Sequence, residues 1–356
     1  MESGTKFLGY EIVSPLGKGG MGEVYLVRKN DEYYALKILS PALAKSNPEY
    51  VKRFAREGKI AVRLRHPNLV AVYDVGYNAE ADCHYIVMEY VNGYDLRSAI
   101  ALGGAMAPKD AIGIIAAVAS ALEAGESLGL VHRDIKPENI MVENDGTVKL
   151  LDLGVAKARG TDSLNTMPQT VFGTPNYIAP EQAQDASKVD SRADVYSLGV
   201  VLYELLAGAR PYERTNPKDV LARLLSPEEL PDVRVKKPDV PEKLAAVLKL
   251  MLAKDAAKRI ESASKLLEIF KKLGYDVSGK QAGEIKPCQS ARPDFNYSSF
   301  MSAKPNPTLS LETKDEEIRS FVDSIKAKKR NARLLRIAAI SLVILLVIVT
   351  LFKFVF

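Results

Sequence analysis

The pattern of apolar and polar positions predicts a small β-rich region followed by a larger helical one. Up to about residue 91, short runs of β-branched and aromatic residues alternate with glycine-rich or polar breaks, which is typical of antiparallel strands. The predicted strands lie at 10–16, 23–28, 33–39, 69–75 and 85–89, with one helix at 48–64. From residue 92 the apolar positions follow a helical period instead, in helices around 111–122, 195–206 and 244–252. The predicted fold class is therefore α+β, with one lobe at 8–91 and a second at 92–274.

The remaining residues predict a linker and a membrane anchor. Residues 275–310 are rich in Gly, Pro, Ser and Asn without a sustained period, which indicates a flexible linker. Residues 311–336 form a charged juxtamembrane segment, which could be a solvated helix or a docking site, and its last part is strongly basic. Residues 337–356 are almost wholly apolar and, at about 1.5 Å per residue, match a hydrocarbon core of about 30 Å.

We therefore expect one transmembrane helix at 337–356. A buried core helix is the alternative, but the segment has no amphipathic face and is entered through six positive charges. The positive-inside rule places the basic run and everything before it in the cytoplasm, with the C-terminus outside.

Composition and charge exclude several classes of protein. An apolar fraction of 47% with 26% charged residues suits a packed core rather than a disordered chain. Cys83 and Cys288 lie far apart and no basic-then-apolar leader opens the chain, so we expect no disulfide framework and a reducing cytosol. The net charge of +5 comes from the basic run at 326–336, which leaves 43 of the 49 basic residues against 44 acidic ones. A nucleic-acid-binding body is therefore disfavoured.

A glycine-rich segment joins the first two predicted strands. Its G-x-G-x-x-G spacing would let the backbone approach phosphate oxygens where a Cβ atom would intrude. A tight hairpin without ligand explains the spacing equally well, but a dinucleotide site would need a helix immediately afterwards, whereas a strand follows. The strand context favours a flap over ATP. The nucleotide contacts predicted in this segment are Gly17, Lys18, Gly19, Gly20, Gly22 and Val24.

Two charged residues of the same lobe can act together on the phosphates. Lys37, in the third strand, is a natural point charge for the α- and β-phosphates, although an isolated strand lysine is usually only solvated. Glu57, in the following helix, could pair with Lys37 and hold it in place.

The densest group of chemically capable residues lies at 131–141. Asp134 can accept a hydrogen bond from a substrate hydroxyl, Lys136 can neutralise a γ-phosphoryl group, and Asn139 can offer its amide oxygen to a hard cation. Asp152 ends a hydrophobic strand and supplies the carboxylate for a second Mg²⁺ contact. A satisfied polar turn would explain any one of these residues, but not all of them together.

In order along the chain, these residues match the signature set of protein kinases. The motifs are Gly17-x-Gly19-x-x-Gly22-x-Val24, Ala35-Leu36-Lys37, His132-Arg133-Asp134 with Asn139, Asp152-Leu153-Gly154 and Ala179-Pro180-Glu181. Over about residues 8–274 the chain resembles bacterial eukaryotic-like (Hanks-type) transmembrane serine/threonine protein kinases. The resemblance implies a two-lobed protein kinase fold, ATP between the lobes with Mg²⁺, and phosphoryl transfer to Ser or Thr hydroxyls of protein substrates.

The resemblance also implies a role for each matching residue. Asp134 would be the catalytic acid/base with Lys136 beside it, and Asn139 and Asp152 would bind Mg²⁺. Asp194 would anchor the catalytic loop. The residues implied to contact ATP beyond the glycine-rich segment are Ala35, Lys37, Glu57, Met88, Glu89 and Val91.

Further positions bear on specificity and stability of the implied kinase. Lys136 and Thr174 resemble the serine/threonine version rather than the tyrosine one, and Glu181 would pair with Arg259. Leu153 stands where the family usually has Phe, a departure that we expect to alter switching rather than abolish chemistry.

The loop after Asp152 predicts control by phosphorylation. We expect a second copy of the chain to phosphorylate Thr166 or Thr170, and the new phosphate to dock on Arg133 and order the loop. Ordinary polar loop residues are the alternative. For the chain as a whole, the alternatives are a pseudokinase scaffold that binds nucleotide without transfer, and a small-molecule phosphotransferase.

Overall fold

The computed structural model describes residues 2–19, 22–46, 48–151, 175–185, 189–212 and 216–278. The chain divides into two compact units, 1–303 and 304–356, and all described residues belong to the first. The predicted linker beyond residue 278, the juxtamembrane segment and the predicted span at 337–356 lie outside the described residues. Among the helices that the structure describes, none is long and apolar enough to cross a membrane.

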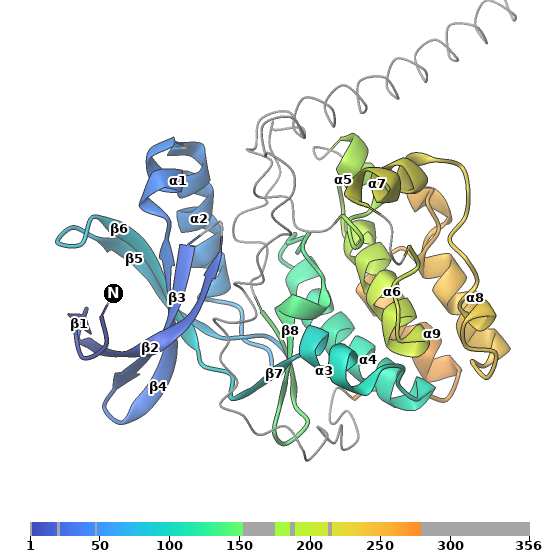
Figure 1. Ribbon diagram of the computed structural model, residues 1–356, viewed down its shortest axis with the longest axis horizontal. Helices are drawn as coiled ribbons and strands as arrows, with labels where there is room; N and C mark the ends of the chain where they lie inside the picture. The colour runs from blue at the N-terminus through green and yellow to red at the C-terminus, as the bar shows by residue number, and fades with distance from the viewer. Residues whose placement is uncertain are drawn as a thin grey trace, which may run out of the picture. The chain divides into compact units, whose positions relative to one another are not determined.

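The N-terminal lobe is built on one six-stranded antiparallel sheet with the strand order β1-β2-β3-β4-β6-β5 (Figure 1). Every predicted strand of this lobe is present, and the short β1 and α1 were not predicted. Strand β2 extends to Gly19, whereas the predicted strand ended at residue 16. The glycine-rich segment therefore belongs to the hairpin of β2 and β3. The bounds are β1 (Lys6–Phe7), β2 (Tyr10–Gly19), β3 (Gly22–Lys29), β4 (Glu32–Leu39), α1 (Pro41–Ser46), α2 (Pro48–Ala61), β5 (Val72–Asn78) and β6 (Cys83–Glu89).

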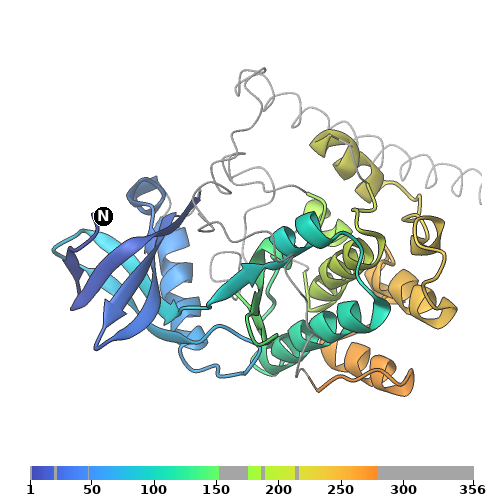
Figure 2. The same cartoon turned by 60° about the horizontal axis from the view of Figure 1, so that its bottom comes forward.

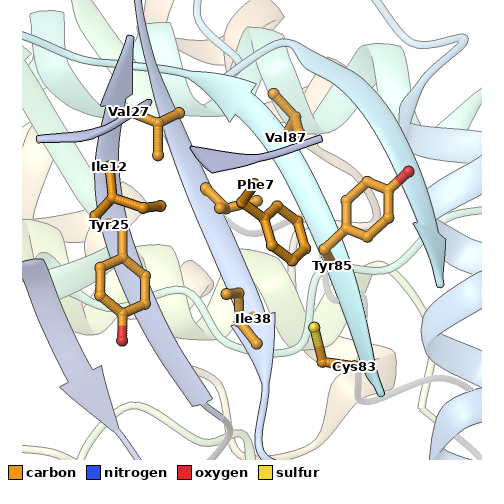
Figure 3. Close-up of a cluster of buried hydrophobic side chains, with 9 residues drawn as sticks. Phe7, Ile12, Tyr25, Val27, Ile38, Cys83, Tyr85 and Val87 are labelled. Carbon is orange, nitrogen blue, oxygen red and sulfur yellow. The ribbon is translucent and has the colours of Figure 1, made fainter. Parts of the chain in front are cut away.

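The period-two alternation of the strands gives this sheet two different faces. In β4, Leu36 and Ile38 point into one buried cluster, whereas Leu39 belongs to another. The first cluster is closed by Phe7 from β1 and contains the thiol of Cys83 (Figure 3). Its members are Phe7, Ile12, Tyr25, Val27, Leu36, Ile38, Cys83, Tyr85 and Val87.

Helix α2 covers the opposite face (Figure 1, Figure 2). Phe54 and Ala61 of this helix pack with Leu39 and Ile86 of the sheet. Gly58 allows the close approach, because a Cβ atom there would lie 2.7 Å from the side chain of Val75 on β5. Any larger residue at this position would push the helix away from the sheet.

The C-terminal lobe is helical, as the change of period after residue 92 predicted. Helix α6 is buried on all sides from Ala193 to Leu206, which makes it the centre of the lobe, and α4, α8 and α9 pack around it (Figure 1, Figure 2). The helices are α3 (Leu96–Gly103), α4 (Pro108–Glu126), α5 (Pro180–Gln184), α6 (Arg192–Ala207), α7 (Pro217–Leu225), α8 (Glu242–Met251) and α9 (Ala263–Lys272). The described part of this lobe also contains the 3₁₀ turns η1 (Pro137–Asn139), η4 (Val233–Val235) and η5 (Ala256–Lys258), and a small sheet of β7 (Gly93–Asp95), β8 (Ile140–Glu143) and β9 (Val148–Leu150).

Backbone pairing ties the two lobes together at strand β9. Leu69 forms a parallel bridge with Leu150, which is why the predicted strand at 69–75 begins only at Val72. The Asn68 side chain donates to the carbonyl of Val148 at 2.9 Å, and Leu150 N–H donates to the carbonyl of Asn68 at 2.9 Å. The start of β5 is therefore held to the end of the strand that precedes Asp152.

Candidate active site

The loop at 130–139 is anchored by one buried carboxylate. Asp194, in the first turn of α6, accepts a hydrogen bond of 2.7 Å from each of the consecutive backbone N–H groups of His132 and Arg133. Burial raises the pKa of Asp194, while the charge of His132 and the two N–H donors favour the carboxylate. The anchoring role expected for Asp194 is confirmed.

Asp134, Lys136 and Asn139 lie together at the end of this loop. The Lys136 ammonium and the Asn139 amide nitrogen each lie 3.0 Å from Oδ2 of Asp134. The Asn139 nitrogen also donates to the Asp134 carbonyl at 2.8 Å. Because Asp134 takes the nitrogen of this amide, the oxygen is the atom of Asn139 that suits a hard cation. The Asp134 side chain is 25% exposed, so the carboxylate remains within reach of a substrate.

The same loop holds the backbone that leads into Asp152. Leu151 N–H donates to the Asn139 carbonyl at 2.8 Å, and the carbonyl of Leu151 accepts from Nε2 of His132 at 2.9 Å. The other ring nitrogen of His132, Nδ1, accepts a hydrogen bond from Asp134 N–H. A neutral His132 ring therefore carries its proton on Nε2, the nitrogen that donates to Leu151. Asp152 itself lies outside the described residues.

On the N-terminal lobe, four of the predicted ATP contacts share one face of the sheet. Val24 is the register partner of Lys37, and Ala35 is the partner of Met88. Cross-strand partners point to the same side, and residues two apart on one strand do as well. Lys37 therefore lies on the same face as the apolar side chains of Val24, Ala35 and Met88, opposite the cluster of Figure 3. Glu57 lies in α2, and its side chain is not among those that the structure describes.

The glycine-rich hairpin pairs Gly17 with Val24 and Gly19 with Gly22. Gly22 has φ +151°, and a Cβ atom there would lie 1.9 Å from the carbonyl oxygen of Ile38. Glycine is thus required at this position by the neighbouring strand, whatever the hairpin binds. Lys18 is exposed and pairs with Glu23 across the hairpin at 2.7 Å. Gly20 lies outside the part of the chain that the structure describes.

At the end of β6, the Glu89 side chain has structural partners. One carboxylate oxygen lies 2.6 Å from the Lys149 ammonium, and the other accepts from Ala71 N–H at 3.0 Å. Val91, two residues on, is buried. Because these two side chains are already occupied or buried, their backbone N–H and C=O groups are what this segment could offer to the edge of an adenine ring.

Helix α5 is bound firmly to the rest of the C-terminal lobe. Arg259, whose side chain is 0% exposed, makes a bidentate pair with Glu181 at 2.7 and 3.1 Å, which confirms the expected pairing. The Gln182 amide bonds the backbone of Ala179 and of Arg133. The guanidinium of Arg133 is buried and donates to the carbonyl of Val189 at 3.3 Å. The predicted regulatory residues Thr166, Thr170 and Thr174 lie outside the described residues.

A second buried network was missed by the sequence reasoning. Arg97 of α3 contacts Glu204 of α6 at 2.7 Å, Glu138 of the catalytic loop at 3.1 Å, and the hydroxyl of Tyr177. Burial opposes the charge of Arg97, but the hydrogen bond to Glu204 and the surrounding acids raise its pKa overall. No sequence signal could have found this network, because Arg97 and Glu204 are 107 positions apart.

Comparison with known proteins agrees with this arrangement. The family model for the protein kinase domain matches residues 10–270. The serine/threonine-protein kinase PknB of Mycolicibacterium smegmatis is 36% identical over 347 residues, which cover 96% of this chain and 54% of that protein. The serine/threonine-protein kinase PrkC of Bacillus subtilis is 37% identical over 256 residues, covering 71% of this chain and 39% of that protein.

A solved structure is similar over about three quarters of the chain. The crystal structure of the PknI kinase domain of Mycobacterium tuberculosis has a TM-score of 0.60 and 32% sequence identity, and the match covers 76% of this chain and 98% of that one. Although the kinase domain is matched almost completely, the chain spans only about half or less of the length of the two curated relatives.

Proposed function

Because the chain belongs to the bacterial Hanks-type family of serine/threonine protein kinases, we propose that it transfers the γ-phosphoryl group of ATP to serine or threonine hydroxyls of proteins. The observation that carries the proposal is the contact of Asp134 with both Lys136 and Asn139 at 3.0 Å. An acid, a cation and a metal-capable amide are thereby available at one point.

In this proposal each residue of the loop has one task. Asp134 accepts the hydrogen bond of the substrate hydroxyl, aligns it and takes its proton as the hydroxyl oxygen bonds to the γ-phosphorus and the bond from that phosphorus to the departing ADP oxygen breaks. Lys136 stabilises the negative charge that develops beside it. The amide oxygen of Asn139 and the carboxylate of Asp152 would be the ligands for Mg²⁺, which would neutralise phosphate charge when bound.

The N-terminal lobe would position the nucleotide. Apolar side chains at Val24, Ala35 and Met88 suit the faces of an adenine ring, and the backbone of 89–91 suits its edge. Lys37, paired with Glu57, would hold the α- and β-phosphates beneath the hairpin at 17–24.

The remaining parts of the chain would place and control this kinase domain, which we assign to residues 8–274. A linker at 275–310, a basic juxtamembrane segment at 311–336 and a membrane-spanning helix at 337–356 would hold the domain on the cytoplasmic side. Each basic residue near anionic lipid would contribute about 1 kcal/mol to binding. Copies confined to one membrane would phosphorylate one another at Thr166 or Thr170, and the phosphate would dock on Arg133.

The decisive experiment compares the wild-type chain with Asp134→Asn, using radiolabelled ATP, Mg²⁺ and a protein substrate such as casein. We expect the variant to transfer phosphate at least about 100-fold more slowly, and the labelled amino acids to be phosphoserine and phosphothreonine. Equal labelling by both proteins would exclude the mechanism. Nucleotide binding without transfer in the wild type would instead identify a pseudokinase.

Two further measurements test the anchor and its control. The full chain should stay with liposomes during alkaline carbonate washing, whereas a fragment of residues 1–336 should be released. Release of both proteins would contradict the proposed transmembrane helix at 337–356. Mass spectrometry of fully active protein should find phosphate on Thr166 or Thr170. An active preparation with both residues unmodified would contradict the regulatory part of the proposal.

A further inference from the structure

We propose that Gln182 is a positioning residue for Asp134, and that through its amide helix α5 controls the orientation of the catalytic carboxylate. The inference rests on the proposed kinase function of Asp134. It concerns a residue two positions after Pro180 that contacts the backbone of the catalytic loop rather than its side chains.

The Gln182 side chain bridges two backbone groups. Its Oε1 accepts from Ala179 N–H at 3.0 Å, and its Nε2 donates to the carbonyl of Arg133 at 3.1 Å. The orientation of the amide follows from these partners, because an N–H group needs an oxygen opposite it and a carbonyl needs a donor. Gln182 is the third residue of α5, the position from which a glutamine commonly reaches back to the start of its helix.

The contact to Ala179 alone would be an ordinary helix cap, but the contact to Arg133 is not local. It joins residues 49 positions apart and reaches the peptide group that links Arg133 to Asp134. A peptide group is planar, so fixing its carbonyl oxygen also fixes the N–H and Cα of Asp134.

This peptide group needs support because Arg133 has an uncommon backbone conformation. Its φ is +64°, a region that costs a residue with a side chain free energy unless neighbours hold it. Asp194 holds the two peptide groups before Arg133, through the N–H groups of His132 and Arg133. Behind Arg133, His132 Nδ1 accepts from Asp134 N–H at 3.3 Å, and Gln182 binds the carbonyl at 3.1 Å.

The three supports differ in origin. Asp194 comes from the central helix and His132 from the loop itself, whereas Gln182 comes from the short helix α5. Helix α5 is in turn fixed by the buried pair of Glu181 and Arg259. The orientation of Asp134 therefore depends on where helix α5 is held. Loss of the Gln182 donor would let the peptide group rotate and would lower kcat rather than nucleotide affinity.

The substitution Gln182→Glu separates the two contacts. A carboxylate keeps an oxygen for Ala179 N–H, so the cap of α5 survives, but it places a second oxygen against the Arg133 carbonyl. At about pH 8 we expect kcat to fall about tenfold, with the Kd for ATP within about twofold of wild type. Gln184→Glu is the matched control, since Gln184 is exposed on the same short helix and the change in charge is identical. It should retain wild-type kcat.

A pH series then distinguishes positioning from simple destabilisation. The introduced carboxyl lies beside a carbonyl oxygen, which favours its protonated form and raises its pKa. Once protonated, it can donate its O–H to Arg133 as the amide does. The ratio of variant to wild-type kcat should therefore rise toward one as the pH falls to about 6. The neutral substitution Gln182→Met has no donor in either condition and should show the loss of kcat without recovery.

Wild-type kcat in Gln182→Glu or in Gln182→Met would overturn the proposal. A loss in Gln182→Glu that does not change with pH, or that is matched by Gln184→Glu, would also overturn it. If Gln182→Glu does not fold, Gln182→Met alone tests the proposal: a loss of kcat with an unchanged Kd for ATP supports it, and wild-type kcat overturns it. Failure of the proposed kinase function would be seen separately, as absence of transfer by the wild-type chain.

Discussion

Removal of the Glu181 carboxylate should destabilise the C-terminal lobe strongly, because it would leave a fully buried guanidinium without its counter-charge. Arg259 is 0% exposed and Glu181 21%, and both oxygens of the carboxylate bind the guanidinium. Among the described residues, the other direct contacts of Arg259 are the carbonyls of Arg192 and Ala253 and the ring of Tyr196, which carry no negative charge. The Asp190 carboxylate acts on Arg259 only electrostatically.

The expected magnitude follows from the asymmetry of buried ion pairs. Breaking such a pair from one side costs about 3–5 kcal/mol, because the surviving charge stays buried. Replacing both partners by apolar residues removes that charge, and the cost is much smaller. We therefore expect Glu181→Ala to lower the free energy of unfolding by about 3–5 kcal/mol, and Glu181→Leu combined with Arg259→Met to cost clearly less than the sum of the single changes.

Urea unfolding followed by circular dichroism measures these free energies, and a shift of roughly 6–20 °C in Tm should accompany the single change. The pair of Lys249 and Glu229 is a suitable control, since its separation of 2.8 Å is similar but both side chains are more than 70% exposed. Glu229→Ala should leave stability unchanged. A cost below about 1 kcal/mol for Glu181→Ala, together with additive single changes, would refute the reasoning.

Two further predictions concern the N-terminal lobe. Burial lowers the pKa of His66 below its ordinary value of 6.5, and Nδ1 of the neutral ring accepts from Asn68 N–H at 3.1 Å. The stabilisation from the neutral ring should therefore be complete above about pH 6.5 and be lost as the pH falls from there to the lowered pKa, so urea midpoints of the wild type should drop in that window more than those of His66→Gln. A parallel drop in both proteins would contradict this. Gly22→Ala should cost about 2 kcal/mol or more and weaken ATP binding, since its Cβ would lie 1.9 Å from the carbonyl of Ile38. Scanning calorimetry and an ATP-binding titration would measure these two effects. Gly103→Ala, whose Cβ would meet nothing within 4 Å, should be nearly neutral in both measurements.

The periodicity and spacing of residues along the chain were enough to predict most elements of the N-terminal lobe and the chemistry of the candidate site. Strands and helices follow from periods of two and of 3.6, because those periods record which side of an element is buried. Asp134, Lys136 and Asn139 could be grouped in advance since they lie within six positions, and one short turn brings them together. The pairing of Glu181 with Arg259 was predicted from the family resemblance, and neither residue shows it by its own surroundings in the sequence.

Tertiary structure alone decided which distant groups became partners. Arg97 meets Glu204 across 107 positions and Gln182 meets Arg133 across 49, and nothing in the local sequence at either end distinguishes these residues from solvated polar ones. The physical reason is that periodicity reports burial of apolar area, which is additive along an element. A buried polar group instead needs one specific partner at hydrogen-bonding distance, and that partner is supplied by whichever segments the packed core brings together.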